Sequence, residues 1–509
     1  MNIIENINGF ARSIPEKAAH VYKNSILTYG DLYSQSNALA SYLLEYMKND
    51  KSPVVVFGHK ENLMLVCFLS CVKSGHAYIP VDSSLPEGRI QDIINSSGTK
   101  IILCTEEPDF TAAEDTLIIT ADKIKDIIKA NSAKTPDKTA AVKPSDVFYI
   151  IYTSGSTGKP KGVQITMNNL ESFVGWGLDF CGIEDSSDHT FLNQAPFSFD
   201  LSVMDLYLSL SSGGTIFSVD KAMISNTGEL FKKLKNSGVT IWVSTPSFAD
   251  MCLADPSFNI NLMPDIKQFL FCGETLTNKT VEGLHNAFEG SKVYNLYGPT
   301  EATVAVTQVL ITEEIRKTIS PLPVGSVKPG CSIYIVQDGN ILNEKEQGEI
   351  VITGDSVSMG YYKNPEMTEK AFFYLTVGNE KIYAYKTGDV GYLSGGQLYY
   401  CGRTDFQIKL NGYRIEIEDI ENNFRKLSDI QNAVVIPSIA ENKITHLNAF
   451  VVLKNKNADK TLKTAIGLKK QLKQFIPEYM VPKKIIFKES LPATANGKID
   501  RKALLSEVK

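Results

Sequence analysis

The chain has 509 residues, of which 43% are hydrophobic and 21% charged, with a formal net charge of −5 at pH 7. This size and composition predict a large buried core and roughly two to four domains, whereas the weak negative charge argues against a nucleic-acid partner. No apolar run approaches the roughly 18 residues of a membrane span, and the N-terminus has no basic head followed by an apolar block, so we expect a cytoplasmic protein.

The cysteines and histidines indicate neither a disulfide framework nor a resident metal. The eight cysteines are dispersed without a C-x-x-C pair, and the six histidines show no H-E-x-x-H spacing. Cys67 and Cys71 share one face of a predicted helix, where two small core residues are the favoured interpretation. We therefore expect no prosthetic group, and we expect any metal to arrive with a substrate.

Up to about residue 400 the chain alternates short apolar runs with helix-like stretches. The pattern predicts helices at 29–49 and 62–75, and strands at 52–59, 99–105, 147–153, 239–245 and 266–274. Alternation of this kind indicates layered α/β structure with largely parallel sheets.

Near Gly402 the character of the chain changes. A charged segment leads into a smaller unit with strands expected at 432–438 and 447–454 and a lysine-rich helix at 461–476. We place a domain boundary at Asp405, which gives domains 1–405 and 406–509. The second domain holds 19 Lys and Arg against 11 Asp and Glu, so it carries +8 and the first carries −13. A basic unit is thus predicted beside an acidic body.

The segment from Tyr152 to Gly162, "YTSGSTGKPKG", follows a predicted strand and has the outline of a phosphate-binding loop. The P-loop spacing fails, because it requires a glycine at Thr153 and a Ser or Thr at Pro160. Backbone N–H groups, hydroxyls and Lys161 can still wrap a polyphosphate. Taken alone, a flexible solvated loop remains the alternative.

Four further motifs follow in order: "NLYGPTEATVAVT", "YKTGDVGYL", "CGRTDFQIKLNGYRIE" and "PATANGKIDRKAL". Together the five resemble the ANL superfamily of adenylate-forming enzymes, which includes acyl-CoA synthetases, luciferases and adenylation domains of nonribosomal peptide synthetases. The resemblance covers the whole chain. It implies the ANL adenylating fold, in which a large N-terminal body of layered α/β subdomains carries a small mobile α+β C-terminal domain.

The resemblance implies a site for ATP with Mg²⁺. In it, Tyr297 stacks on adenine, Asp389 accepts hydrogen bonds from the ribose hydroxyls and Arg403 lies near the sugar and phosphate. Without the resemblance, "YGPT" is typical of a plain turn. Asp389 and Arg403, each taken alone, are typical of charged residues on the protein surface. The matching ATP positions are Thr153, Ser154, Gly155, Ser156, Thr157, Gly158, Lys161, Asn295, Leu296, Tyr297, Gly298, Pro299, Thr300, Asp389, Tyr400, Cys401, Gly402, Arg403 and Lys498.

The same resemblance makes Lys498, Thr300 and Glu301 the catalytic group. Lys498 bridges the acyl carboxylate and the α-phosphate, Thr300 approaches the α-phosphate and Glu301 helps to hold Mg²⁺. The chemistry needs positioning and charge stabilisation but no protein nucleophile. Asp405 matches the hinge about which the small domain rotates, after which Lys409 and Gly412 replace Lys498 at the site.

The sequence departs from the family pattern beyond this hinge. Glu418 and Asp419 occupy the positions at which the family motif usually has a Gly-Glu pair. The hinge assignment is unaffected, whereas side-chain assignments further along the chain are less secure.

The acid that is activated is indicated by "PFSFDLSVMDLY" and "FLFCGETL", which are similar to the stand-alone members of the superfamily that activate D-alanine. The resemblance implies that Asp200 pairs with the substrate ammonium and that Cys272 faces the α-carbon, with Met204, Leu201, Val304 and Lys498 completing the site. Without it, a helix N-cap aspartate and a core cysteine are the plain interpretations. Steric exclusion of one methyl-sized group changes the ratio of kcat/KM between two substrates by about 10- to 200-fold. Discrimination against L-alanine is therefore expected to be incomplete.

The partners follow from the same resemblance. No carrier module with a G-G-x-S attachment signal occurs in the chain, so the expected acceptor is a separate D-alanyl carrier protein bearing phosphopantetheine, which feeds teichoic acid D-alanylation. The +8 domain suits an acidic carrier, although lysine-rich surfaces are commonly just solvated. We expect a monomer. The alternatives are an adenylating enzyme for another small amino acid, an acyl-CoA synthetase, and an inactive ATP-binding regulatory relative.

Overall fold

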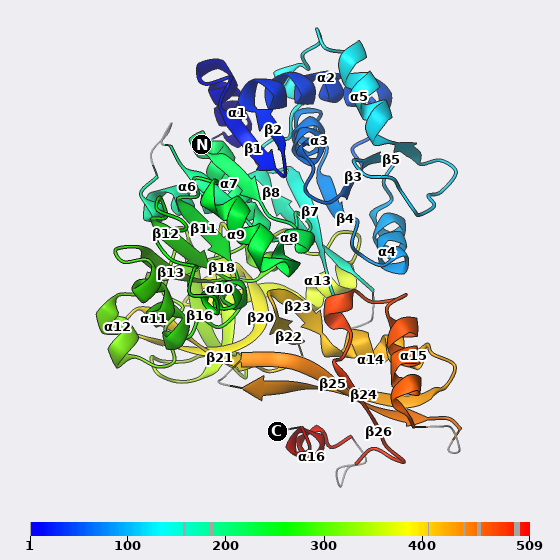
Figure 1. Cartoon of the computed structure of the whole chain (residues 1–509), viewed down its shortest axis with the longest axis vertical. Coiled ribbons are helices and arrows are strands. Elements are labelled where there is room, and N and C mark those ends of the chain that lie inside the picture. The colour runs from blue at the N-terminus through cyan, green and yellow to red at the C-terminus, as the bar shows by residue number, and fades with distance from the viewer. Residues whose placement is uncertain are drawn as a thin grey trace.

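The computed structural model describes residues 2–155, 159–183, 188–405, 407–440, 443–455, 460–492 and 499–508. Three sheets with their covering helices form a large body, and a smaller C-terminal unit, drawn in orange and red in Figure 1, lies against one side of it. The expected mixed α/β architecture is confirmed. Within the described ranges, no helix has both the length and the apolar character needed to cross a membrane.

The first sheet has the strand order β6-β5-β3-β4-β7-β8 and is parallel except for the β7–β8 hairpin. This hairpin brackets the glycine-rich segment, because β7 ends at Thr153 and β8 begins at Lys161. The strands are β3 (Val54–Gly58), β4 (Tyr78–Asp82), β5 (Ile101–Cys104), β6 (Leu117–Ile119), β7 (Val147–Thr153) and β8 (Lys161–Thr166), and the helices of this region are α1 (Ile3–Ser13), α2 (Tyr29–Met47), α3 (Asn62–Lys73), α4 (Glu87–Ser97), α5 (Ala121–Ala130) and the 3-10 turn η1 (Lys138–Ala140).

The second sheet has the order β15-β14-β13-β12-β11-β9-β10-β1-β2, with a parallel centre and antiparallel edges. Its strands are β1 (Ala18–Tyr22), β2 (Ser25–Thr28), β9 (Thr190–Asn193), β10 (Thr215–Ser218), β11 (Ile241–Ser244), β12 (Gln268–Phe271), β13 (Lys292–Tyr297), β14 (Thr307–Leu310) and β15 (Ser326–Val327). Its helices are α6 (Met167–Cys181), α7 (Leu201–Ser212), α8 (Lys221–Ser225), α9 (Thr227–Lys235), α10 (Pro246–Leu253), α11 (Asn278–Ala287), η2 (Thr300–Ala302) and α12 (Glu313–Thr318). The carboxyl ends of β9, β11, β12 and β13 meet at one edge, where α/β sheets place their ligands.

The third sheet is antiparallel and completes the body. Its long strand β20 pairs with β21 in a register that sets Asp389 opposite Arg403. The elements are β16 (Cys331–Gln337), β17 (Asn340–Ile341), β18 (Gly348–Gly354), α13 (Pro365–Ala371), β19 (Phe372–Val377), β20 (Glu380–Ser394) and β21 (Gln397–Arg403).

The C-terminal unit has its own core, in which Ile415, Phe424 and Val451 are fully buried. Its elements are β22 (Gln407–Leu410), β23 (Tyr413–Glu416), α14 (Ile417–Arg425), β24 (Ile430–Ala440), β25 (Lys443–Leu453), α15 (Leu462–Leu472), η3 (Glu478–Met480), β26 (Lys484–Phe487) and α16 (Arg501–Ser506). The proposed boundary at residues 405/406 falls between β21 and β22. Across this boundary, the buried Asp419 of α14 forms an ion pair with Arg89 of α4 at 3.4 Å. Asp419 is one of the two residues that depart from the family pattern, and it thus makes an interdomain contact.

The strands and helices expected from the sequence are confirmed, with ends shifted by a few residues. Cys67 and Cys71 are fully buried on α3, as their spacing predicts. All eight cysteines, each within the described ranges, are free thiols.

Candidate active site

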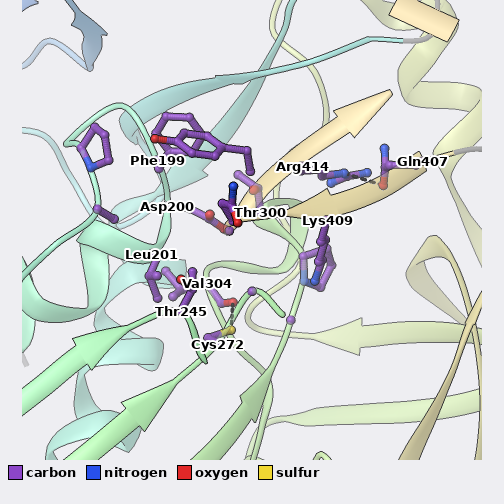
Figure 2. Close-up of a pocket in the computed structure, with 18 of the residues that line it drawn as sticks. Phe199, Asp200, Leu201, Thr245, Cys272, Thr300, Val304, Gln407, Lys409 and Arg414 are labelled. Carbon is purple, nitrogen blue, oxygen red and sulfur yellow. Dashed lines mark hydrogen bonds between the residues drawn. The ribbon is translucent and has the colours of Figure 1, made fainter. Parts of the chain in front are cut away.

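A pocket opens at the carboxyl ends of β9, β11, β12 and β13 and is covered by the β22–β23 hairpin of the C-terminal unit (Figure 2). The loops that follow these strands contribute residues 194–196, 199–201, 272–273 and 298–300, together with Thr245. The third sheet adds Asp389 and Arg403, and the hairpin adds residues from Gln407 to Arg414. Large body and C-terminal unit therefore build the pocket together.

Asp200 brings a carboxylate into this pocket from the start of α7. It occupies the N-cap position, but its side chain makes no capping hydrogen bond, so the N-cap interpretation does not account for it. Burial raises the pKa of this carboxyl to about 6, with a hydrogen bond from Thr300 and the charge of Lys409 acting in the opposite direction. At neutral pH the site therefore offers a mainly ionised carboxylate.

Cys272, Leu201 and Val304 form the wall of the pocket near Asp200 (Figure 2). The Cys272 thiol points towards the Val304 carbonyl at 3.8 Å, and burial raises its pKa to about 11, so it is a neutral, bulky group and no nucleophile. Met204 is fully buried and is absent from the described lining residues. It lies one helical turn beyond Asp200, inside the core, because only the first turn of α7 reaches the pocket.

The turn that carries Val304 is strained. Thr303 and Val304 have φ of +56° and +67°, in the left-handed region that β-branched residues avoid. Each such residue costs of the order of 1–3 kcal/mol, so the surrounding packing must hold the turn in place. Held in this way, the turn places the Val304 carbonyl 3.8 Å from the Cys272 thiol at the pocket.

Asp389 lies at the other end of the pocket in a buried polar cluster. It accepts a hydrogen bond of 2.6 Å from the Tyr297 hydroxyl and pairs with the Arg403 guanidinium. Arg403 also donates two hydrogen bonds to Asp405, at 2.7 and 2.8 Å. Among the remaining predicted positions of this region, Asn295 and Leu296 are buried, Tyr400 lies 6.1 Å from the Tyr297 ring, and Cys401 is exposed. The structure thus brings the three ribose and adenine candidates, Tyr297, Asp389 and Arg403, together.

Glu301 is fully buried and surrounded by donors. It accepts hydrogen bonds from the Tyr361 hydroxyl at 2.7 Å and from Arg414 of the C-terminal unit at 2.5 Å, and Lys161 lies 3.7 Å away. Burial acts to raise the pKa of this carboxyl, but the charges of Arg414 and Lys161 outweigh it and hold the pKa at about 2. Within the described residues, no group of three His, Cys, Asp or Glu side chains that could hold a metal ion is found.

The glycine-rich segment is described on both flanks. The Thr153 hydroxyl is buried without a partner within the described residues, and Ser154 donates to the Arg414 carbonyl at 2.9 Å. Gly155 is needed, because a Cβ would lie 2.3 Å from the Lys159 carbonyl oxygen. Ser156, Thr157, Gly158 and the catalytic candidate Lys498 lie outside the described residues.

The C-terminal unit delivers two further groups to the pocket. The Lys409 ammonium lies 5.8 Å from the centre of the Tyr297 ring and opposes the burial that raises the pKa of Cys272. Gly412 has φ of +82° and packs so closely on Thr245 that a Cβ would lie 2.3 Å from its methyl group. These are the two residues expected to replace Lys498 after domain rotation.

Several lining residues were not predicted as functional. Thr245 follows β11 as Cys272 follows β12, and this shared place at the strand ends was the available signal. Phe199 packs edge-to-face on Tyr413 at 4.8 Å, and Tyr413 stacks on Tyr479 at 3.7 Å. No sequence signal links Phe199 to rings more than 200 residues away.

Comparison with known proteins agrees with this geometry. Residues 9–362 match the family described as "AMP-binding enzyme", and residues 419–498 match "AMP-binding enzyme C-terminal domain". A Listeria monocytogenes protein named "D-alanine--D-alanyl carrier protein ligase" is 48% identical over 512 residues, covering 100% of this chain and 99% of its own. A Bacillus cereus protein of the same name is 47% identical over 509 residues, covering 100% of both.

Solved structures share the fold at lower identity. A double mutant of o-succinylbenzoate CoA synthetase from Bacillus subtilis, bound with its product analogue, has a TM-score of 0.82 at 20% identity and covers 99% of this chain and 98% of its own. The adenylation domain AlmE of Vibrio cholerae, in complex with glycyl-adenosine-5'-phosphate, has a TM-score of 0.80 at 22% identity, covering 99% and 96%. The full-length matches establish that this chain belongs to the AMP-binding enzyme family and, within it, to the D-alanine--D-alanyl carrier protein ligases.

Proposed function

We propose that this enzyme activates D-alanine with ATP to form D-alanyl-AMP and then transfers the D-alanyl group to the thiol of a separate carrier protein. The observation that carries the proposal is the pairing of Asp200 with Cys272 in one small pocket, lined also by Leu201 and Val304. A carboxylate there suits a substrate with an ammonium group and repels the chain of a fatty acid.

The pocket favours a small D-amino acid. With the ammonium held by Asp200 and the carboxylate directed towards Thr300, the methyl group of L-alanine would point at the Cys272 thiol. Steric exclusion by a thiol lowers the rate for L-alanine by about 10- to 200-fold. D-alanine, whose methyl group points the other way, and glycine escape this contact.

Adenylation joins the D-alanine carboxylate to the α-phosphorus of ATP and releases pyrophosphate. Lys161 and the backbone of the glycine-rich segment would hold the phosphates, Asp389 the ribose and Tyr297 the adenine. Thr300 would donate to the α-phosphate, and Lys498 would bring its charge to the phosphorus under attack. Mg²⁺, held by Glu301 together with the phosphates, would neutralise charge on the leaving pyrophosphate.

Thioester formation would use the domain arrangement described here. The carrier thiol attacks the carbonyl carbon of D-alanyl-AMP, the carbon–oxygen bond to the phosphate breaks, and AMP leaves. Lys409 stands beside Asp200 and Tyr297, where its charge would stabilise the leaving phosphate. The close approach of Gly412 to Thr245 would seat the β22–β23 hairpin at the pocket for this step.

The carrier would bear phosphopantetheine and would pass D-alanine on towards teichoic acid, and the enzyme would act as a cytoplasmic monomer. Docking would use the basic face of α15, which carries Lys469 and Lys470, with Lys473 at its end. Lys473 pairs with Glu478 at 2.8 Å, whereas the side chain of Lys470 is exposed to solvent. Charge reversal at Lys470 should therefore slow carrier loading, more so at low ionic strength.

The test is amino-acid-dependent ATP–pyrophosphate exchange with D-alanine, L-alanine, glycine, D-serine and a short fatty acid, on the wild type and on Lys498→Ala. Exchange led by D-alanine and lost in Lys498→Ala supports both the substrate and the role of the lysine. Exchange led by another acid would overturn the pocket assignment while keeping the chemistry. Absence of exchange with every acid would favour an ATP-binding regulatory protein.

A further inference from the structure

Lys60 is a fully buried lysine that lies outside the pocket, in the short connection between β3 and α3. Its ammonium points at the end of β9, where it donates to the side-chain oxygen of Asn193 at 2.6 Å. It also lies within 3.1 Å of three successive backbone carbonyls, those of Asn193, Gln194 and Ala195. Four oxygens thus converge on one cation that has three N–H groups to donate.

The backbone held in this way is the wall of the amino-acid pocket. Gln194 and Ala195 line the pocket, and a tight turn, closed by the Phe199 N–H donating to the Pro196 carbonyl at 3.0 Å, leads directly to Asp200. Only four residues therefore separate the lysine-bound carbonyls from the carboxylate that meets the substrate ammonium.

The chain that follows Asp200 is also bonded to Asn193. Asp205 lies on α7, is fully buried, and accepts a hydrogen bond of 2.9 Å from the Asn193 side chain. Asn193 is in turn bonded by the Ser218 hydroxyl at 2.7 Å. The segment 193–205 is therefore closed at both ends around Asn193, with Lys60 supplying the charge that balances Asp205.

Stability alone does not explain a cation at this place. Burial lowers the pKa of the Lys60 amine to about 7, against the opposing charges of Asp205, Asp82 and Asp220. With Asp205 also made neutral, an apolar side chain of similar length would fill the space without that cost. What it could not do is hold three consecutive carbonyls in one orientation.

We propose that Lys60 is a positioning residue for the amino-acid substrate, one that sets the place of Asp200 by holding the 193–195 backbone and never touches the substrate. The inference rests on the proposed function in taking D-alanine as the ligand of Asp200. A shift of about 1 Å in a positioning group can lower the reaction rate about 100-fold. Loss of Lys60 should therefore impair the use of the substrate even though the lysine lies outside the pocket.

The chain offers a matched control in Lys73. This lysine is also buried, lies at the end of α3, and donates at 2.8 Å to the side chains of Ser36 and Asn37 on α2. None of its described partners lines the pocket. Lys73→Met therefore reports what the loss of a buried ammonium does when the pocket wall is left alone.

The experiment measures pyrophosphate exchange and amide hydrogen exchange on the wild type, Lys60→Met, Lys73→Met and Lys60→Met/Asp205→Asn, with thermal melting as the stability readout. In Lys60→Met we expect KM for D-alanine to rise about 10- to 100-fold, KM for ATP to change less than twofold, and the preference for D- over L-alanine to fall. Amides of residues 194–203 should exchange faster than in the wild type. Lys73→Met should lower the melting temperature with neither effect.

The double variant separates positioning from charge balance. Removing Asp205 together with Lys60 should restore the melting temperature, because no unpaired charge is left buried, while KM for D-alanine stays high. Recovery of KM along with stability would overturn the proposal, as would unchanged amide protection of 194–203 in Lys60→Met. A wild type that shows no D-alanine exchange contradicts the proposed function instead, and the amide measurement still decides on Lys60.

Discussion

Arg414 of the C-terminal unit donates a hydrogen bond of 2.5 Å to Glu301, a fully buried carboxylate of the large body. Glu301 is also the residue expected to hold Mg²⁺ with ATP. A guanidinium and a metal cannot occupy the same carboxylate oxygen, so we expect the Arg414 contact and a metal at Glu301 to exclude each other. We therefore predict that the contact forms in the second half-reaction, after pyrophosphate and its metal have left.

Arg414→Met should therefore impair thioester formation and spare adenylation. Without the guanidinium, the buried Glu301 loses its principal charge partner in this orientation, which disfavours the orientation by several-fold or more. We expect carrier loading to fall at least 10-fold while pyrophosphate exchange stays within about twofold. Arg425→Met, which removes a half-exposed arginine with a weak 3.9 Å ion pair, is the control. Equal loss of both half-reactions in Arg414→Met would contradict this account.

The affinity for D-alanine should fall in acid because of Asp200. In the proposed site only the ionised carboxylate would bind the ammonium, and the pKa of this group is raised to about 6. The kcat/KM for D-alanine should thus decline about tenfold per pH unit below 6, whereas KM for ATP stays level over the same range. Pyrophosphate exchange between pH 5 and 8 measures both. If the pH profile of kcat/KM for D-alanine shows no break near pH 6, Asp200 does not bind the substrate ammonium.

The raised pKa of Asp200 also means that its ionised carboxylate lowers the stability of the folded protein. Its pKa is 3.8 in the unfolded chain and about 6 in the folded protein, so the folded state favours the protonated form and loses stability as the pH rises from 3.8 through 6. Above pH 6 the loss is up to about 3 kcal/mol. Asp200→Asn should accordingly raise the melting temperature at pH 7.5 while nearly abolishing exchange. A lower melting temperature would show that the carboxylate has a stabilising partner.

The sequence allowed the prediction of those site residues that follow strands or stand in motifs. Asp200, Cys272 and Asp389 are of this kind, and the structure brings them into one pocket. Arg414 lay within a quoted motif but received no role, because its partner Glu301 is 113 residues away and the contact depends on domain orientation. Lys60 was missed entirely, since a single lysine before a helix carries no pattern and its ligands are more than 130 residues distant.

Cys272→Ala should relax the preference for D-alanine. Removing the sulfur opens the side of the α-carbon where the L-methyl group would lie, while Asp200 is untouched. The ratio of kcat/KM for D- over L-alanine should drop by about 10-fold, mainly through gain for L-alanine. Cys252→Ala, at another fully buried cysteine that does not line the pocket, is the control. If activity with L-alanine stays unchanged in Cys272→Ala, another group excludes the L-methyl.

Gly412→Leu should block the second half-reaction alone. The glycine has φ of +82° and its backbone N–H donates to Glu274 at 2.9 Å, which seats the β22–β23 hairpin on Thr245. A leucine would collide with the Thr245 methyl and push the hairpin off the pocket, so carrier loading should fall 100-fold or more while pyrophosphate exchange persists. Gly396→Leu, in a turn with φ of +74° and no atom near the new Cβ, carries a similar backbone penalty without the collision. Loss of carrier loading in both variants would assign the defect to backbone strain, whereas loss in Gly412→Leu alone would show that this close approach positions the hairpin for the thiol.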